Sequence, residues 1–281
     1  MSVILASLLQ KIAIQQKDPI IDSILEKYYD HASVTINFIY YANLRFLRDK
    51  NYLSALLESD FLLPDGIALR LLWSRFQTKG FLDFLLHGPT FLTHIPNHNG
   101  TDFVPYFLRT INGKKERARV FLYGGMPETV RTAQAKLESQ FPEYVFASQH
   151  GYAPLDLSLL EQFFDSEKTG MKEILPWPIL PQDHTWYPRG GIYNILLVGL
   201  GTPKQELWIA DHRSLFEHSH LLIFSVGGLF DFISESENRA PKFIRNLNLE
   251  WLFRVVTNPR KNALKTLHSI KVFWDLCFPP R

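Results

Sequence analysis

The stretch Ile195-Leu-Leu-Val-Gly-Leu-Gly-Thr-Pro-Lys-Gln-Glu-Leu-Trp-Ile209 decides the fold class of this chain. It begins as a short apolar run, the length of a buried parallel strand, and passes through two glycines into a helix-like segment. A second run, Phe224-Ser-Val-Gly-Gly-Leu-Phe-Asp-Phe232, repeats this order. Strand, tight loop and helix in succession, twice, predict an α/β fold with a mainly parallel, Rossmann-like sheet flanked by helices.

The glycine loops also indicate a class of ligand. In an open α/β sheet, ligands bind at the carboxyl ends of the strands, and backbone N–H groups at a helix N-terminus can hold a phosphate. A third loop, Phe121-Leu-Tyr-Gly-Gly-Met-Pro-Glu128, has the same form, with Pro127 suited to the first helical turn. The sequence has neither a complete dinucleotide fingerprint nor a P-loop, so a single loop fits an ordinary tight turn equally well. Three such loops favour a phosphorylated or nucleotide-linked substrate.

Length and composition predict an ordinary globular protein. With 281 residues, of which 46% are hydrophobic, the chain can form one large domain or one domain with an appendage. Its single cysteine, Cys277, excludes an internal disulfide and fits a reducing compartment. No run approaches the roughly 20 apolar residues of a membrane span, and the first residues lack the leading positive charge of a signal peptide. We therefore expect a cytoplasmic protein.

The charge is unevenly distributed. Residues 239–281 hold nine Lys or Arg and two acidic residues, a net charge of +7, which leaves −5 for residues 1–238 of the overall +2. Apolar residues recur at helical spacing on both sides of Asn258-Pro259. They are Ile244, Leu247, Trp251 and Val255 before it, and Ala263, Leu267, Ile270, Trp274 and Cys277 after it.

This pattern divides the chain into an α/β domain, residues 1–238, and a basic, amphipathic helical appendage, residues 239–281. A basic and aromatic helix pair is typical of a segment that lies on anionic lipid. A helical subdomain packed on the core with solvated basic faces is the alternative. We expect no nucleic-acid binding, because the pI of about 8.5 is modest and no nucleic-acid motif accompanies the charge.

Two polar sites are predicted in the N-terminal half. The segment Ser33–Ile39 alternates as a half-buried strand does, which places Thr35 and Asn37 on one face. These side chains could line a pocket or bond to a nearby turn. Asp65 stands between a proline and a glycine at the end of an apolar run, where it fits either a turn residue or a general base at the mouth of a cleft.

Searches for metal and nucleophile motifs exclude several classes. No two aspartates are separated by one residue, so the Asp-x-Asp metal clamp of many sugar-nucleotide transferases is missing. The pairs His94/His98 and His218/His220 lack the context of a zinc site, and there is no G-x-S-x-G serine elbow. We therefore expect no metal and no cofactor, with phosphate charge met by the protein alone.

Together these motifs resemble the TagA/WecG/CpsF glycosyltransferases, in which they occur in the same order. The resemblance runs from about Thr35 to Lys261 and is most specific in its Pro-Lys-Gln-Glu and Arg-Ala-Pro blocks. The motifs are Thr35-x-Asn37, Pro64-Asp-Gly66, Asn99-Gly-Thr-Asp102, Leu122-Tyr-Gly-Gly125, His150-Gly-Tyr152, Val198-Gly-Leu-Gly-Thr-Pro-Lys-Gln-Glu206-x-Trp-Ile209, Gly227-Gly-Leu-Phe-Asp231, Arg239-Ala-Pro-Lys-Phe243 and Leu249-Glu-Trp-Leu-Phe-Arg254.

The resemblance implies transfer of a sugar, typically from a UDP-sugar, to a polyprenyl-diphosphate-linked sugar at the cytoplasmic membrane face, without a bound metal. It implies that Asp65 is the catalytic base, that the reaction inverts to a β-linkage, and that Thr35 and Asn37 flank the site. The remaining substrate-binding candidates are Gly66, Asp102, Gly124, Gly125, Tyr152, Gly199, Gly201, Lys204, Gln205, Glu206, Gly227, Gly228 and Asp231. Candidates for the acceptor diphosphate or the membrane are Arg239, Arg245, Arg254 and Arg260.

The sequence departs from the family pattern in two places. Extra residues lie between Arg70 and Gly100, and Asn97 stands where the family usually has an arginine. A second insertion, about 170–191, is rich in Pro and Trp and is predicted to be an irregular surface loop that shapes the acceptor site or a subunit contact.

We therefore expect a glycosyltransferase of hexoses or N-acetylhexosamines in bacterial capsule, exopolysaccharide or teichoic acid biosynthesis. It would be peripheral on the inner face of the cell membrane, and it is a possible homo-oligomer. The alternatives are an inactive sugar-nucleotide-binding or scaffold protein, against which Asp65 argues, and a nucleotide-cofactor oxidoreductase, against which the incomplete glycine fingerprint argues.

Overall fold

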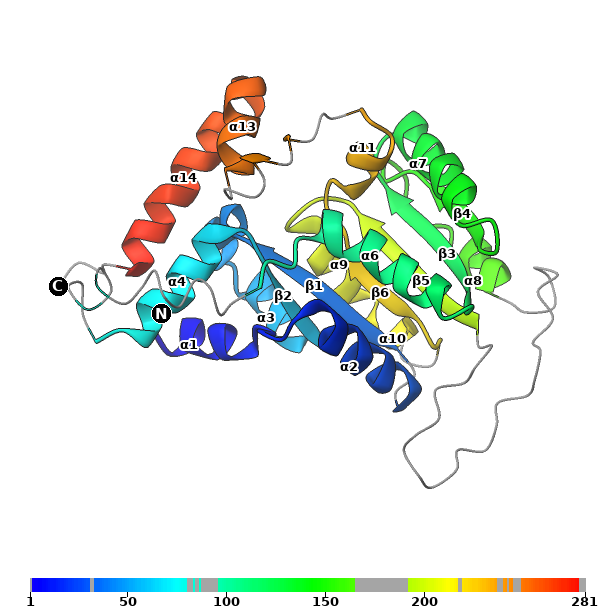
Figure 1. The fold of residues 1–281 in the computed structure, drawn as a ribbon, viewed down its shortest axis with the longest axis horizontal. Coiled ribbons are helices and arrows are strands. Elements are labelled where there is room, and N and C mark those ends of the chain that lie inside the picture. The colour runs from blue at the N-terminus through cyan, green and yellow to red at the C-terminus, as the bar shows by residue number, and fades with distance from the viewer. Residues whose placement is uncertain are drawn as a thin grey trace.

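The protein forms one six-stranded parallel sheet with helices on both faces (Figure 1). The computed structural model describes residues 2–30, 33–79, 83, 86, 96–164, 192–216, 219–236, 240, 241, 243, 244 and 249–277. Within these ranges every strand pair is parallel, in the order β2-β1-β6-β5-β3-β4. This confirms the predicted α/β fold with a parallel sheet.

The elements alternate between strand and helix along most of the chain. The strands are β1 (Val34–Tyr40), β2 (Phe61–Asp65), β3 (Arg117–Gly124), β4 (Val145–Gln149), β5 (Ile192–Gly199) and β6 (Leu222–Ser225). The helices are α1 (Ser2–Lys11), α2 (Lys17–Asp30), the short 3₁₀ helix η1 (Tyr41–Phe46), α3 (Lys50–Glu58), α4 (Ile67–Gln77), α6 (Gly100–Gly113), α7 (Pro127–Gln140), α8 (Leu157–Phe164), α9 (Lys204–Asp211), α10 (Arg213–Phe216), α11 (Leu229–Ile233), α13 (Glu250–Thr257) and α14 (Pro259–Cys277). As predicted, Pro127 opens its helix, because its missing N–H needs no partner there.

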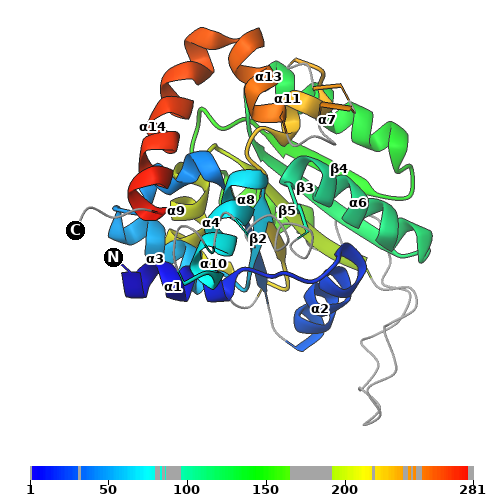
Figure 2. The ribbon, with the colours of Figure 1, turned by 60° about the vertical axis from the view of Figure 1, so that its left-hand side comes forward.

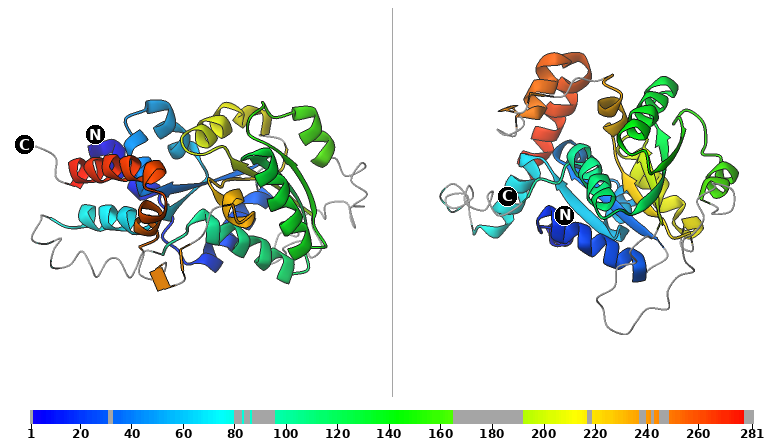
Figure 3. Two further views of the ribbon diagram at one scale, coloured as in Figure 1. Left: turned by 90° about the horizontal axis from the view of Figure 1, so that it is seen from above. Right: turned by 45° about the vertical axis from the view of Figure 1, so that its right-hand side comes forward.

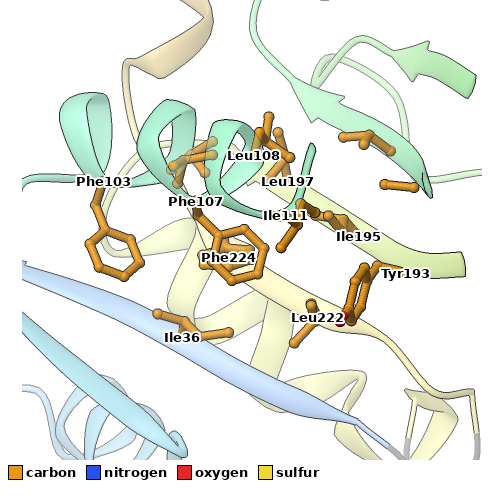
Figure 4. Packing of buried hydrophobic residues seen from close by; sticks show 14 of the residues in the cluster. Ile36, Phe103, Phe107, Leu108, Ile111, Tyr193, Ile195, Leu197, Leu222 and Phe224 are labelled. Atoms are coloured by element: carbon orange, nitrogen blue, oxygen red, sulfur yellow. The ribbon is translucent and has the colours of Figure 1, made fainter. Parts of the chain in front are cut away.

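Helices cover both faces of the sheet (Figure 3). On one face, α2, α6, α7 and α11 pack over the central strands, and Figure 4 shows Phe107 and Ile111 of α6 against Phe224 and Ile195. On the other face, α1, α3 and α4 cover β1 and β2, while α8, α9 and α10 cover β3 and β5. A sheet buried on both sides needs strands that are apolar throughout, as the runs ending at Gly199 and Ser225 are.

The prediction of a strand at β1 is correct, but the prediction that this strand is half-buried is wrong. Residues 34–39 are all buried, and the strand is therefore not half-buried. Alternation within it separates the residues packed under α2 and α6 from those under α1 and α3. Alternating polarity alone cannot show that a second helical layer covers the polar face.

The two C-terminal helices lie together at one end of the molecule (Figures 1 and 2). The break between them falls at Asn258, as predicted. α14 packs against η1 and α4, and Trp251 and Val272 add half-buried side chains to the cluster beneath. Of the predicted apolar stripe, however, Leu267, Ile270 and Trp274 are exposed. In the part of the chain that the structure describes, no helix has both the length and the apolar character to cross a bilayer.

Candidate active site

The carboxyl ends of β3 and β5 meet at a pair of glycines. β3 leads into α7 on one face of the sheet and β5 into α9 on the other, so the loops separate between these neighbouring strands. Ligands of open α/β sheets bind at such a point. Gly124 and Gly199 pair directly here, and a Cβ on Gly124 would lie 2.3 Å from the carbonyl oxygen of Gly199. Only glycine allows this approach.

Several glycine N–H groups of the loops are already used within the protein. Gly125 N–H donates to the carbonyl oxygen of Gly199 at 3.2 Å, and Gly151 N–H donates to that of Gly125 at 3.0 Å. The N–H groups of Gly201 and Gly227 donate to the side chain of Gln205. These four donors therefore shape the loops, and other groups must meet the charge of a bound phosphate.

Gln205 joins the two loops that follow β5 and β6. Its side chain is 3% exposed, and Oε1 accepts from Gly201 N at 3.2 Å and from Gly227 N at 3.0 Å. Both glycines have a positive φ, +77° and +55°, a conformation that residues with a Cβ rarely adopt. The resemblance predicted that Gln205 lies near the donor. In the structure its side chain is buried and connects the two loops by hydrogen bonds.

Glu206 is buried beside Gln205. Its Oε1 accepts from Thr202 Oγ1 at 2.8 Å and from Gln205 Nε2 at 3.0 Å. Burial raises the pKa of this carboxyl, although the hydrogen bonds from Gln205 and Thr202 lower it. Thr202 in turn accepts from Asn43 Nδ2 of η1 at 3.3 Å, which connects the loop after β5 to η1.

Asp65 lies at the carboxyl end of β2, at the edge of the sheet where the glycine loops lie. It is half-buried, and Gly66 after it has φ +86° and is the N-cap of α4. Gly66 N–H donates to Asn97 Oδ1 at 2.8 Å, and His98 N–H donates to the carbonyl oxygen of Pro64 at 2.8 Å. Asn97, the departure from the family pattern, therefore holds the turn that presents Asp65.

Thr35 is not brought to Asp65. It lies at the beginning of β1, and its backbone N–H and Oγ1 both donate to Asp60 Oδ2, at 2.7 and 2.9 Å. Asp60 precedes β2 and forms an ion pair with Lys27 at 2.8 Å. Burial raises the pKa of Asp60, but the bonds from Lys27 and Thr35 outweigh it and lower the pKa below its usual value. Thr35 thus binds a partner at the opposite end of β1 from the edge where the glycine loops lie.

Asn37 lies farther along β1, beside a residue that the sequence did not single out. Ile36 pairs with Phe224, so the next residues, Asn37 and Ser225, lie level on neighbouring strands and on the other face of the sheet. Both side chains are buried, and Asn37 Oδ1 and Ser225 Oγ have no hydrogen-bond partner among the described residues. A hydroxyl at the end of an apolar run, two positions before Gly227-Gly228, was the signal in the sequence.

The family model described as Glycosyl transferase WecG/TagA/CpsF family matches residues 8–167 and 192–279. The chain belongs to this family. It is thus a glycosyltransferase of surface-polysaccharide biosynthesis, which uses a sugar donor and a lipid-linked acceptor. The unmatched residues 168–191 coincide with the second predicted insertion, which lies outside the described residues.

Other residues of the WecG/TagA/CpsF motifs lie around this edge of the sheet. Lys204 is exposed at the first position of α9, and Tyr152, 76% exposed, follows β4. Asp231 lies in the first turn of α11, which Gly228 precedes. Asp102 lies in the first turn of α6, where Asn99 Oδ1 accepts from its N–H and Asn99 Nδ2 donates to its carboxylate.

The arginines assigned to the acceptor are only partly described. Arg239 and Arg245 lie outside the described residues. Arg254 belongs to α13, and Arg260 is exposed in the first turn of α14. No cluster of three His, Cys, Asp or Glu side chains suited to a metal ion occurs in the ranges that the structure describes.

Proposed function

We propose that this glycosyltransferase moves a sugar from a UDP-sugar to a polyprenyl-diphosphate-linked sugar, with inversion and without a metal ion, on the inner face of the cell membrane. The observation that carries the proposal is the edge of the sheet where the glycine loops after the neighbouring strands β3, β5 and β6 lie together. Asp65 lies at the same edge, at the end of β2. The reaction requires a site for the nucleotide diphosphate and a base for the acceptor hydroxyl, and this edge of the sheet offers a candidate for each.

In the proposed mechanism, Asp65 accepts the proton of an acceptor hydroxyl as that oxygen attacks the anomeric carbon of the donor. The bond between this carbon and the diphosphate oxygen breaks from the opposite side, which inverts the configuration and releases UDP. Because four glycine N–H groups are engaged within the protein, Lys204 at the start of α9 is our candidate to meet the diphosphate charge. The basic residues after 238 are candidates for the acceptor diphosphate.

The C-terminal helices support attachment to lipid. Apolar side chains on α13 and α14 stay exposed beside exposed basic residues such as Arg260 and Lys271. The exposed apolar side chains are Leu252, Val256, Leu264, Leu267, Ile270 and Trp274. An apolar stripe with basic neighbours is the chemistry that binds an anionic bilayer surface. We propose that residues 239–281 place the active site near the lipid-linked acceptor.

The test is a transfer assay with purified protein, a panel of UDP-sugars and a polyprenyl-diphosphate-linked acceptor, with the product identified by mass spectrometry. We expect one donor to give a β-linked product, at a rate that EDTA does not change. A rate that recovers only on adding Mg²⁺ or Mn²⁺ would reveal a cation site. Binding of UDP-sugar without turnover, under conditions that retain the fold, would favour a binding protein.

A further inference from the structure

A buried glutamate with only neutral hydrogen-bond partners lies beneath the donor loops. Glu206 is 1% exposed, and its partners among the described residues are the hydroxyl of Thr202 and the amide of Gln205. Its second oxygen, Oε2, is buried and has no hydrogen-bond partner in those residues. A carboxylate in such surroundings is costly, whereas a neutral acid needs no counter-charge.

The neighbouring groups also fit a neutral acid. Oε1 accepts two hydrogen bonds, which is the role of a carbonyl oxygen, and leaves Oε2 to carry the proton. The hydroxyl of Tyr52, from α3, lies near enough that a charge on Glu206 would raise the pKa of that tyrosine further, after burial has already raised it. The hydrogen bonds to Oε1, a backbone hydrogen bond and the place of Glu206 in the first turn of α9 favour its ionised form, but burial outweighs the bonds and the pKa of this carboxyl is raised.

The bond from Gln205 to Glu206 sets the orientation of the Gln205 amide. Nε2 points to Glu206 Oε1, so Oε1 of the same amide faces the N–H groups of Gly201 and Gly227. If the Gln205 amide were flipped, its NH₂ group would face the N–H groups of Gly201 and Gly227, and the hydrogen bonds from both glycines would be lost. Glu206 therefore acts on the loop after β6 only through Gln205, and on the loop after β5 both through Gln205 and through its own hydrogen bond from Thr202.

We propose that Glu206 is a positioning residue that, as a neutral carboxylic acid, locks the Gln205 amide and so holds the loops after β5 and β6 in their donor-binding form. The proposal rests on the proposed function for its kinetic consequence only. The hydrogen bond from Gln205 to Glu206 is a property of the protein without ligand. Gln205 binds the two loops, and Glu206 fixes the orientation of the Gln205 amide.

The experiment compares Glu206→Gln with Glu206→Ala in the full chain, with Glu161→Ala on the exposed face of α8 as the matched control. Glutamine keeps a carbonyl acceptor for Thr202 and Gln205 and an N–H donor in place of the acid proton. Hydrogen exchange of the Gly201 and Gly227 amides is measured without nucleotide or acceptor. We expect about tenfold faster exchange in Glu206→Ala and no change in Glu206→Gln or the control.

Steady-state kinetics supply the second measurement. A loosened donor loop weakens donor binding, so Glu206→Ala should raise the KM for the UDP-sugar about tenfold with a smaller effect on kcat, while Glu206→Gln stays near wild type. Equal loss of amide protection in Glu206→Gln and Glu206→Ala would overturn the proposal that Glu206 acts as a neutral acid. Unchanged protection in Glu206→Ala would overturn its positioning role. If Glu206→Ala does not fold, the amide exchange of Glu206→Gln is compared with that of wild type: equal exchange supports the neutral acid, and faster exchange in Glu206→Gln contradicts it. A wild-type protein without transferase activity would refute the proposed function and leave the exchange result intact.

Discussion

Asp65 is the residue on which the proposed chemistry depends. Replacing it by Asn keeps the shape and the turn after β2 but removes the proton acceptor. We expect kcat to fall by roughly 100-fold or more, at the low end of what general-base catalysis contributes. Turnover of Asp65→Asn is compared with that of Asp49→Asn, an exposed aspartate that caps α3. Unchanged turnover in Asp65→Asn would remove this carboxylate from the mechanism, provided the melting temperature shows an intact fold.

Glu206 predicts a pH dependence of stability. Its pKa in the folded protein lies above the ordinary value of 4.5, because burial disfavours the charged form. The folded state then holds the proton more tightly, so the stabilisation is complete below about pH 4.5 and is lost as pH rises through the folded pKa. Tyr52, which faces Glu206 from α3, has a pKa raised well above 10.0 and stays neutral in this window.

The measurement is the free energy of unfolding of wild type minus that of Glu206→Gln, by denaturant titration from pH 4 to pH 9. We expect this difference to decrease with pH by up to about 1.4 kcal/mol per unit above the ordinary glutamate pKa, because glutamine has no proton to lose. A difference that is flat across the range would show that the carboxyl does not hold its proton in the folded protein.

Gly124 predicts the cost of placing a side chain where β3 and β5 meet. A Cβ there would meet the backbone oxygen of Gly199 at 2.3 Å, and φ is +134°. Gly124→Ala should therefore destabilise the fold by at least about 2 kcal/mol, the sum of backbone strain and displaced backbone. Gly113→Ala at the end of α6, where a Cβ meets nothing within 4 Å, is the control and should be neutral or slightly stabilising. Equal stability of the two variants would contradict the geometry.

At the scale of elements, the sequence was sufficient to place β5, α9, β6 and α11, because each apolar run ends in glycines that force a turn into a helix. It also placed Asp65 at a strand end, from the apolar run that precedes it. It could not show that Thr35 and Asn37 differ in role, since alternation fixes the face of a residue and not the end of the sheet that it approaches. That depends on the register, in which Ile36 lies beside Phe61 at the start of β2.

Hydrogen bonds between elements were also beyond the sequence. The motif placed Gln205 near the donor, but its two bonds to Gly201 and Gly227 exist only once α9 and the loop after β6 are packed together. The same holds for Asn97, which stands where the family usually has an arginine and accepts the hydrogen bond from Gly66 N–H. Contacts of this kind join residues 22 and 31 positions apart, and no local pattern encodes them.

At the scale of the whole molecule, the C-terminal helices predict how the protein meets lipid. Leu264 and Trp274 of α14 are 70% and 61% exposed, and Leu267 lies between them on the same helix. Substituting all three by Gln should abolish sedimentation with anionic vesicles and lower transfer to the lipid-linked acceptor. Each buried large side chain contributes roughly 1.5–3 kcal/mol to such binding, and each basic residue near the surface about 1 kcal/mol.

The exposed side chains make a sharper test than removal of residues 239–281. α14 packs on η1 and α4, so its deletion would uncover the cluster beneath and damage the fold. The control is Leu159→Gln on α8, an exposed leucine outside the C-terminal helices. Undiminished vesicle binding by the triple variant would show that α13 and α14 are only a packed subdomain, with no part in reaching the acceptor.

The short helix η1 touches α14 on one side and, through Asn43, the loop of Thr202 on the other. Two ligands that meet one shared element are subject to thermodynamic reciprocity. Whatever factor a bilayer applies to the affinity for the nucleotide sugar, the nucleotide sugar must apply to the affinity for the bilayer. If the proposed membrane attachment and donor binding strengthen each other, a cell rich in donor recruits more of the enzyme to the membrane, and the abundance of a small metabolite then sets where the protein resides as well as how fast it works.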